Sequence, residues 1–557
     1  MTGDHQDSAR ACIPARNLYN CSIMAQIFTS IGGTFQYGYN ISIINAPTTY
    51  VQKFINETCV ERWGTALEPS QVTLIWTFIV SIYSLGGLLG SLLAGPMAIK
   101  CGRKGALLLN NCFLFLSAVL ALSSRAAGSF EMIILARLLV GVNAGPKGAL
   151  LLNNCFLFLS AVLALSSRAA GSFEMIILAR LLVGVNAGVS MNVQPMYFGE
   201  SAPKNLRGAG AFSSAVFTAF GILMGQVTGL TEVLGSESLW PYLLASNALP
   251  GLVQLVTLPW FPESPRFLLI DRGDREACGQ ALKRLRACSV FTAEMEEILQ
   301  ERAGAGEARA KTLWELFRDR SLRRQLCTVM AASSAMMLCG NDSIYFYTSY
   351  IFQEAGIPTD KIQYVTIGTG ACEFTSAVAC NLLIERVGRR LLLAGGYLFM
   401  ACWAVVFTVA LSLEGKVDGM PYLSMVCMFA YILSFGMGPA GVTGILPAEL
   451  FDQMARPAAY MVAGSMMWLN LFLIGMAFPF IVNGLGQFCF IPFCGVCVTA
   501  CLFIGFTLPE TKGRTLAEIT EEFEKRNKKG TANGLPKYGE QSQSLTDLSE
   551  CLETDNV

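Results

Sequence analysis

Long apolar runs alternate with short polar stretches over most of this chain. Because about 20 apolar residues make one membrane-crossing helix, candidate spans begin near residues 18, 72, 105, 130, 148, 173, 209 and 239, and again near 325, 364, 391, 420, 458 and 488. The pattern predicts an all-α membrane protein with 14 candidate spans. We expect an N-terminal tail (1–17), a first helical half (18–261), a linker of short amphipathic helices (262–324), a second helical half (325–508) and a polar C-terminal tail (509–557).

One segment of the first half occurs twice without a single change. Residues 104–145 and 147–188 are identical over 42 positions, with Pro146 between them. Structural repeats diverge because each copy meets different neighbours, so identity indicates a very recent duplication or an error in assembling the gene, and we favour the error. Removing one copy leaves twelve spans, six in each half. We expect the first copy to supply the third helix of the bundle and the second copy to supply the fourth.

Composition excludes several classes of function. The chain is 53% hydrophobic and 14% charged, and its net charge is zero, so nothing indicates a nucleic-acid partner. The single histidine, His5, lies in the N-terminal tail, which removes histidine-based proton relays, metal sites and Ser-His-Asp catalysis. Most of the nineteen cysteines lie in apolar runs, where cysteine behaves as a small hydrophobe. We therefore expect no enzyme activity, no cofactor, no metal and no disulfide framework.

The distribution of positive charge orients the chain. Cytosolic loops carry an excess of Lys and Arg, and one set of predicted loops holds Lys100, Arg103, Lys104, Lys204, Arg207, Arg386, Arg389, Arg390 and Arg456. This places both termini and the linker in the cytosol. Asn56-Glu57-Thr58 falls on the opposite side, which makes Asn56 a candidate glycosylation site.

Two kinds of motif recur in the same order in both halves. Gly102-Arg103-Lys104 and Gly388-Arg389-Arg390 each separate two apolar runs, and each half ends on a Pro-Glu motif, at Pro262-Glu263 and at Pro509-Glu510. Such recurrence at equivalent depth is typical of a duplicated membrane transporter.

Together, these motifs resemble the facilitative hexose transporters, the sugar-porter branch of the major facilitator superfamily, and in particular their second class. The stretches that carry the resemblance are Gly38-Tyr39-Asn40, Ile44-Asn45-Ala46-Pro47, Arg180, Pro195 to Glu200, Pro262 to Arg266, Cys339 to Asp342, Glu385 to Arg390, Pro439, Glu449 to Phe451 and Pro509 to Gly513. The resemblance implies a major facilitator fold with two six-helix halves, 12 core helices, a hexose as the small-molecule partner, and a place in the plasma membrane. It implies transport by alternating access.

Polar residues at lipid depth are expensive, so they should line a sugar cavity or bond a neighbouring helix. In the first helix these are Gln36 and Asn40, and both explanations stay open for Asn40. Asp342 and Glu373 stand where many hexose carriers have asparagines that bind sugar, and the alternative for this pair is a polar lock between the seventh and eighth helices. The remaining candidates for the sugar site are Tyr345, Phe435, Trp468 and Asn470.

Other sugar contacts of the family are missing from this chain. A tryptophan of the tenth helix is replaced by Gly444, and the run Asp342-Ser343-Ile344 matches a short motif whose final Ile or Val accompanies fructose use in the family. The resemblance therefore implies transport of fructose as well as glucose. Asn40 replaces an aspartate of the proton-coupled relatives and cannot take up a proton, which favours uniport.

Charged residues at the cytosolic ends are the last candidates. The resemblance implies two clusters that hold the halves together on the inside and gate the carrier: Arg103, Glu200, Arg207, Glu263 and Arg266, and Glu385, Arg389, Arg390 and Glu449. Three functions stay open, namely a hexose uniporter, a proton-coupled sugar symporter that uses Asp342 or Glu373, and a non-transporting sugar sensor of the same fold. The oligomeric state is open as well.

Overall fold

The computed structural model describes residues 27–101, 173–201, 207–286, 294–296, 298–299, 312–413, 416–417, 419–452, 455–512, 514 and 518–523. Within these ranges the chain forms helices and no strand, which confirms the all-α prediction. The candidate spans near residues 105, 130 and 148, and the tails before 27 and after 523, lie outside the described residues. Residues up to Lys512 form one compact unit, and the following residues form a second.

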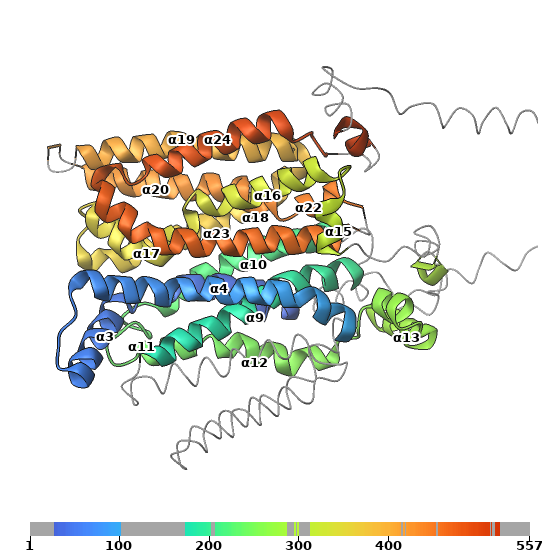
Figure 1. Cartoon of the computed structure of the whole chain (residues 1–557), viewed down its shortest axis with the longest axis horizontal. Coiled ribbons are helices and arrows are strands. Elements are labelled where there is room, and N and C mark those ends of the chain that lie inside the picture. Colours follow the sequence, from blue (N-terminus) through green and yellow to red (C-terminus); the bar gives the residue numbers. More distant parts are fainter. Residues whose placement is uncertain are drawn as a thin grey trace, which may run out of the picture. The chain divides into compact units, whose positions relative to one another are not determined.

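The helices of the first half are α2 (Thr34–Ser42), α3 (Thr48–Trp63), α4 (Pro69–Cys101), α9 (Glu174–Ser201), α10 (Arg207–Thr228), α11 (Trp240–Ala245) and α12 (Ala248–Thr257), followed by the short helix η3 (Leu258–Trp260). Of these, α4, α9, α10 and α11 begin within a few residues of the predicted starts near 72, 173, 209 and 239, whereas α3 was not predicted. Among them, α4 packs along α9 (Figure 1), and α2 packs along α10.

The second half follows a linker of short helices, as the sequence predicts. The linker contains η4 (Phe267–Asp271), α13 (Arg275–Arg286) and α15 (Leu313–Arg318). The second half consists of α16 (Arg323–Leu338), α17 (Asn341–Glu354), α18 (Thr359–Val387), α19 (Arg389–Ser412), α20 (Met420–Met437), α21 (Pro439–Thr443), α22 (Leu446–Leu450), α23 (Arg456–Leu485), η5 (Gly486–Phe488) and α24 (Ile491–Thr507). The two halves meet where α4 packs on α23 and where α10 packs on α18.

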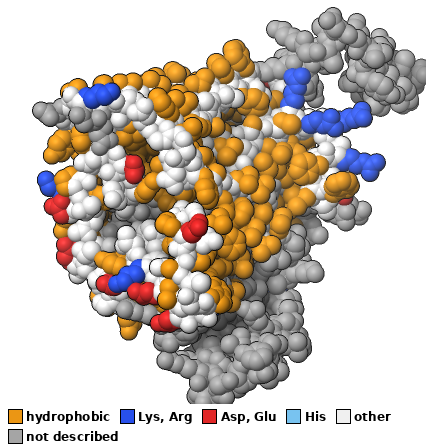
Figure 2. Space-filling model, turned by 60° about the vertical axis from the view of Figure 1, so that its left-hand side comes forward, with side chains coloured by type: hydrophobic (Ala, Val, Ile, Leu, Met, Phe, Trp, Pro, Cys, Tyr) orange, Lys and Arg blue, Asp and Glu red, His pale blue; other side chains and the backbone are white. Residues whose placement is uncertain are grey.

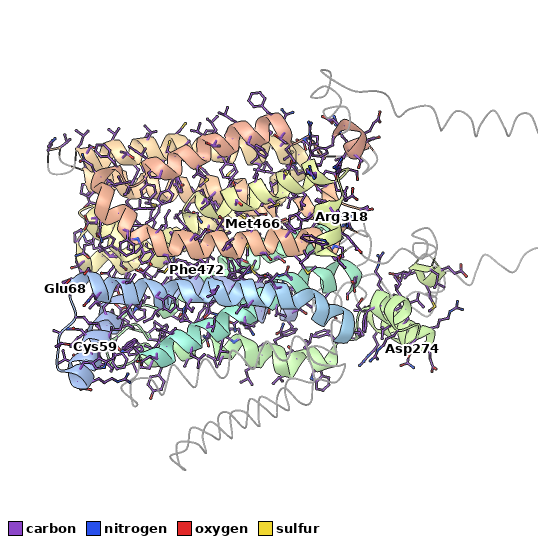
Figure 3. All side chains as sticks on the ribbon, in the orientation of Figure 1. Cys59, Glu68, Asp274, Arg318, Met466 and Phe472 are labelled. Carbon is purple, nitrogen blue, oxygen red and sulfur yellow. The ribbon has the colours of Figure 1, made fainter. Side chains whose placement is uncertain are left out.

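The bundle has an apolar flank and two polar ends. Among the described residues, six helices are long and apolar enough to cross a membrane. Large apolar side chains such as Leu382, Leu398 and Leu473 are exposed on these helices, and Figure 2 shows hydrophobic atoms covering this flank. In Figure 3, Cys59 and Glu68 lie at one end of the helices, hereafter the α3 end, and Arg318 lies at the other, the α15 end.

Two glycine pairs hold α4 and α9 in backbone contact. Gly86 and Gly90 face Gly184 and Gly188, and both pairs are four residues apart. A Cβ added at Gly184 would lie 1.9 Å from the carbonyl oxygen of Tyr83, and one added at Gly86 would lie 2.1 Å from that of Leu181. Without a hydrophobic effect to drive association, helices in a membrane gain their contact energy from such close approach. We call these four residues the glycine seam.

The second copy of the repeat supplies the fourth helix of the bundle. Helix α9 begins at Glu174 and packs on α4, and its Arg180 is only 3% exposed, which confirms the expectation for this copy. The third helix lies outside the described residues.

Deleting residues 104–146 should give at least as much folded protein as the 557-residue chain, and more heat-resistant protein. The deletion joins Arg103 to Lys147 and leaves one copy of the 42-residue unit, so it removes Arg137, the counterpart of the buried Arg180. An unpaired arginine at a helix centre facing lipid would cost about 3 kcal/mol. Size-exclusion profiles and thermal midpoints of the two forms test this. Loss of folded protein on deletion, with an active 557-residue form, would show that both copies belong to the bundle.

Candidate functional site

A break in the seventh span brings polar groups to lipid depth. Helix α16 ends at Leu338, Gly340 adopts a left-handed φ of +84°, and α17 starts at Asn341. A Cβ on Gly340 would also lie 2.9 Å from the ring of Phe493, so glycine suits this position for two reasons. Discontinuous helices of this kind form the substrate sites of many transporters. The sequence predicted one continuous span here, because a hydropathy window averages over a single short break.

Glu373 is bonded to the start of α17. It lies within α18 and is 5% exposed, and the Tyr345 hydroxyl donates a short hydrogen bond to its Oε2. The Asn341 amide nitrogen lies 3.5 Å from the same oxygen. These contacts link the seventh and eighth helices through Glu373, as the polar-lock alternative predicts. They also bring together Tyr345 and Glu373, two of the residues predicted for the sugar site.

Asp342 makes a different contact, which crosses between the halves. It is 6% exposed, and the Tyr37 hydroxyl of α2 donates a hydrogen bond of 3.1 Å to its Oδ2. Sequence reasoning missed Tyr37, although it lies next to Gln36 in the same helix. The site therefore spans the interface of the halves, where a change in their orientation would alter it.

Trp468 fills a socket in the opposite half. Its ring is fully buried and meets Tyr37 and Tyr83 edge to face, at centroid distances of 5.4 and 5.6 Å. A Cβ on Gly87 would lie 2.2 Å from the indole, so only glycine leaves room for it. The predicted apolar wall at Trp468 thus lies beside the Tyr37–Asp342 contact.

Gln36 and Asn40 belong to a separate buried cluster within the first half. The Gln36 amide donates to the carbonyl oxygen of Asn247 at 2.5 Å, and Asn247 donates to Oδ1 of Asn40 at 3.2 Å. Arg180 donates to the Asn40 carbonyl oxygen at 3.1 Å and stacks over the ring of Tyr83 at 4.8 Å. Successive residues of a helix point about 100° apart, so Tyr37 faces α17 while Gln36 and Asn40 face α12. The structure thus shows the helix-bonding alternative for Asn40.

Asn470 and Phe435 lie on two other helices of the second half. The Asn470 amide donates to Ser334 Oγ of α16 at 3.0 Å and to the Met466 carbonyl oxygen at 2.7 Å. Phe435 is 2% exposed on α20. No hydrogen bond among the described residues joins Asn470 to Asp342 or Glu373.

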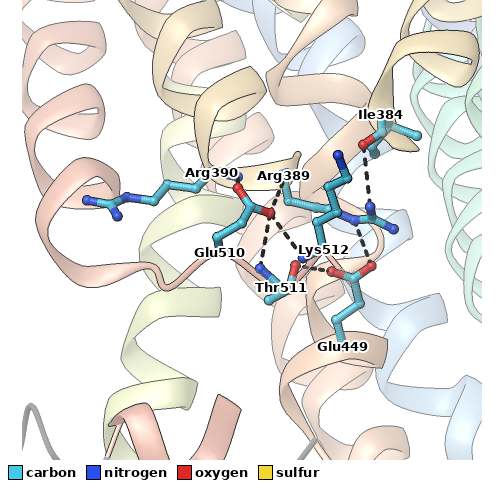
Figure 4. A network of polar contacts seen from close by, with 7 residues as sticks. All are labelled: Ile384, Arg389, Arg390, Glu449, Glu510, Thr511 and Lys512. Atoms are coloured by element: carbon cyan, nitrogen blue, oxygen red, sulfur yellow. Dashed lines mark hydrogen bonds and ion pairs between the residues drawn. The ribbon is translucent and has the colours of Figure 1, made fainter. Parts of the chain in front are cut away.

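The charged cluster of the second half surrounds the start of α19 (Figure 4). Arg389 Nε donates to Glu449 Oε1 at 3.0 Å, in an ion pair whose side chains are 9% and 22% exposed. The Glu510 carboxylate accepts from the backbone amides of Arg389 and Arg390, at 2.9 and 3.1 Å. A carboxylate at this position satisfies amides that have no partner within the helix and complements the helix dipole.

The contacts in Figure 4 join α19, α22 and the segment after α24, all within the second half. That the cluster also holds the two halves together stays a prediction. Arg390 also donates to the Gly505 carbonyl oxygen of α24. The motif resemblance names these residues without their partners, so the contacts within the second half were not predicted.

The first half repeats part of this arrangement. The Ser264 hydroxyl donates to Glu200 at 2.5 Å, and the Thr511 hydroxyl donates to Glu449 at the same distance. In each Pro-Glu motif, the glutamate also accepts from the next backbone amide, at 2.9 Å for Glu263 and 3.1 Å for Glu510. Sequence analysis missed both hydroxyls. Arg103 lies outside the described residues, as do the side chains of Arg207 and Glu385, and Arg266 is half-buried.

At the α3 end, the halves are joined by hydrogen bonds. Asn45 donates to Ser349 Oγ at 3.0 Å, and the Gln226 amide donates to Thr369 Oγ1 at 2.9 Å. On the surface, Tyr364 donates to Glu232 at 2.6 Å, and this bond lowers the pKa of the Glu232 carboxyl.

Asn56 lies at the same end, within helix α3. Its Oδ1 accepts a hydrogen bond of 3.1 Å from the backbone amide of Leu67, while Thr58 is 2% exposed. Cys59, which follows in the same helix, is fully buried and free.

Comparison with known proteins agrees with this architecture. The chain matches the family described as "Sugar (and other) transporter" over residues 25–146 and 143–523, and the two matches overlap at the joint of the repeat. It is 54% identical over 504 residues to the human (Homo sapiens) solute carrier family 2, facilitated glucose transporter member 11, covering 90% of this chain and 93% of the relative. It is 40% identical over 505 residues to human member 5 (91% and 92% covered) and 39% identical over 506 residues to mouse (Mus musculus) member 9 (91% and 86% covered).

Solved structures show the same fold. The xylose transporter XylE from E. coli, in a partially occluded inward open conformation, superposes with a TM-score of 0.67 at 20% identity, covering 89% of this chain and 100% of that one. The proton:xylose symporter XylE bound to 6-bromo-6-deoxy-D-glucose gives 0.67 at 22% identity, covering 90% and 99%. The major facilitator fold is thereby confirmed. The family match covers most of the chain, and the identity to a facilitated glucose transporter is 54% over 90% of its length. The chain therefore belongs to the sugar transporter family.

Proposed function

We propose that this protein carries hexoses across a membrane by facilitated diffusion, through alternating access. The observation that carries the proposal is the site at the interface of the halves, where Asp342 bonds Tyr37 beside Trp468 in a chain 54% identical to a facilitated glucose transporter. A sugar that binds one orientation of the halves better than the other can shift their equilibrium. The proposed substrate-binding residues at this interface are Asp342, Tyr345, Glu373 and Trp468. The predicted set also includes Phe435, Asn470, Gln36 and Asn40, of which the last two are bonded within the first half.

We further propose uniport, with fructose carried at least as well as glucose. Asn40 is an amide, and its partners are Gln36, Asn247 and Arg180, so no proton acceptor stands at this position. A Cβ added at Gly444, the position of the family's tenth-helix tryptophan, would meet no atom within 4 Å. The absence of that indole supports a wider pocket than a glucose-selective site needs.

The rival function is proton-coupled symport through Asp342 or Glu373, the two buried carboxylates of the site. Purified protein in vesicles should let labelled fructose and glucose equilibrate without accumulating, whether or not a proton gradient is imposed. Accumulation driven by the proton gradient would replace uniport by symport. Binding without net flux would identify a sensor.

Asp342→Ala should raise the apparent KM for hexose about two- to tenfold, because one hydrogen bond to a hydroxyl contributes about 0.5–1.5 kcal/mol. Initial rates of labelled fructose uptake measure this, normalised to the amount of protein in the vesicles. An unchanged KM in correctly folded protein would remove Asp342 from the sugar site.

The proposed location is the plasma membrane, with both termini and the α15 end in the cytosol and with Asn56 glycosylated on the outside. The proposed gating network consists of Arg103, Glu200, Arg207, Glu263, Arg266, Glu385, Arg389, Arg390 and Glu449. The positive charges of the predicted loops support this orientation.

A further inference from the structure

We propose that the sugar site is selective for protonated amino sugars, whose ammonium group binds between Asp342, Glu373 and Asn341. This inference rests on the hexose transport proposed above and names the substrate class of the same site. We call these three residues the acceptor cluster.

The acceptor cluster has oxygen atoms that no group outside the cluster, within the described ranges of the chain, satisfies. Asp342 accepts from Tyr37 through Oδ2, and Glu373 accepts from Tyr345 and Asn341 through Oε2. Asp342 also has a side-chain hydrogen bond from Asn341, which belongs to the same cluster. Among the described residues outside the cluster, no group donates to Oδ1 of Asp342 or Oε1 of Glu373. Asn341 is fully buried, and its nitrogen faces Glu373, yet its own Oδ1 has no hydrogen-bond partner.

No Lys or Arg in the part of the chain that the structure describes compensates the two carboxylates. Among the described residues, neither Asp342 nor Glu373 forms an ion pair with Lys or Arg. The buried Arg180 lies over the ring of Tyr83 instead and donates to a backbone carbonyl. A buried carboxylate without a cationic partner is costly, so a ligand that brings positive charge gains from this pair.

The chemistry of the open atoms selects the ligand. All three are oxygens that accept hydrogen bonds when the carboxylates are ionised, whereas an ammonium group has three donors and no acceptor. A sugar hydroxyl has one donor and also presents lone pairs, so it matches such a cluster less well. Hydrogen bonds between ionised partners are also about twice as strong as those between neutral ones.

The first experiment needs no variant. Uptake of labelled glucose into vesicles that contain the full chain is inhibited with glucosamine, N-acetylglucosamine or unlabelled glucose, at a pH below the pKa of the amino sugar. We expect glucosamine to inhibit at a concentration at least about tenfold lower than glucose. N-acetylglucosamine, which keeps the nitrogen but carries no charge, should show no such advantage. Equal inhibition by glucosamine and glucose would overturn the proposal.

Two charge-neutralising variants locate the selectivity. Asp342→Asn and Glu373→Gln keep the shape of each side chain, and each should lower the ratio of the glucose to the glucosamine inhibition constants about tenfold. The ratio cancels any general loss of activity. Glu354→Gln removes an exposed carboxylate from the other end of α17, and it should leave the ratio unchanged. A ratio that both Asp342→Asn and Glu373→Gln leave at the wild-type value would contradict the inference.

Two further readouts separate this inference from the function on which it rests. Replacing sodium by choline should not change hexose uptake, and sodium dependence would assign the acceptor cluster to a coupled ion instead. Binding of labelled glucosamine to the purified protein is measured independently of flux. Preferential binding without any hexose flux would support the acceptor cluster and refute the proposed transport, while flux without the preference would do the reverse.

Discussion

Gly184→Val should leave almost no folded protein. A Cβ at this position would lie 1.9 Å from the carbonyl oxygen of Tyr83, and this atom belongs to the backbone of α4, so no side chain can rotate to make room. The helices must separate, which removes the contacts of the whole glycine seam. Overpacking typically costs 1–3 kcal/mol and sometimes more, and we expect about 3 kcal/mol or more here, a large part of the stability of a typical domain. Size-exclusion profiles and thermal midpoints in detergent measure the loss.

Two companion variants make this test specific. Gly86→Val changes the α4 side of the glycine seam, which has no counterpart in the repeated unit, and it should have the same effect. Gly495→Val lies in α24, where an added Cβ meets no atom within 4 Å, and it should fold like the wild type. Wild-type midpoints for both Gly184→Val and Gly86→Val would show that α4 and α9 do not pack through these glycines.

Glu449→Ala should have the second-largest effect. The substitution removes the carboxylate that pairs with Arg389, whose side chain is 9% exposed, and it also removes the acceptor of the Thr511 hydroxyl. Removing one partner of a buried ion pair typically costs 3–5 kcal/mol. Because Glu449 itself is 22% exposed, we expect a smaller loss of about 2–3 kcal/mol. The thermal midpoint should fall, and trypsin should cut more readily near the start of α19.

An exposed ion pair supplies the control. Glu237→Ala breaks the contact with Lys53, which has a similar length of 2.8 Å but exposed fractions of 56% and 58%. Such surface pairs contribute about 0–1 kcal/mol, so the midpoint should barely move. Equal effects of the two variants would mean that the cluster around Arg389 adds nothing beyond surface charge.

Binding of an inhibitor that reaches only the outward-open form tests the gating role of the same cluster. A side-chain contact shifts the equilibrium between two states only if its energy differs between them. If Glu449→Ala lowers inhibitor binding at a temperature where the protein stays folded, the cluster depends on the state of the carrier. Unchanged binding would leave it a structural contact of the second half.

Within the described residues, the sequence predicted the starts of the long spans to within a few positions, because each is a long apolar run with its own boundary residues. It did not predict α3 or the break before α17. It did predict that Asp342 and Glu373 need partners, because charge at lipid depth is costly. It did not predict which partners. Residues Gln36 to Ile41 of α2 are all buried, so the pattern of that helix has no exposed face from which to orient Tyr37 or Asn40. Contacts between the halves depend on how two complete bundles dock, which no local pattern contains.

The Ser264 and Thr511 hydroxyls were missed for a related reason. Each lies in a Pro-Glu motif next to charged residues that already had a predicted role. Because serine and threonine are common at the ends of helices, their presence there did not indicate a specific partner. Their role became visible only when the structure placed each hydroxyl 2.5 Å from a glutamate of another helix.

The glycine seam also determines where this protein can deform. Where two backbones touch, no side chain can change rotamer to absorb a displacement, so we expect α4 and α9 to move together as one rigid body. Helices α2 and α10 approach each other equally closely at Gly38 and Gly221. Between the halves, the fit depends on side chains such as Trp468 in its socket, which can slide or change rotamer. We therefore expect the two halves to move relative to each other at their interface. A displacement caused there by a bound ligand would then move each rigid helix pair along its whole length.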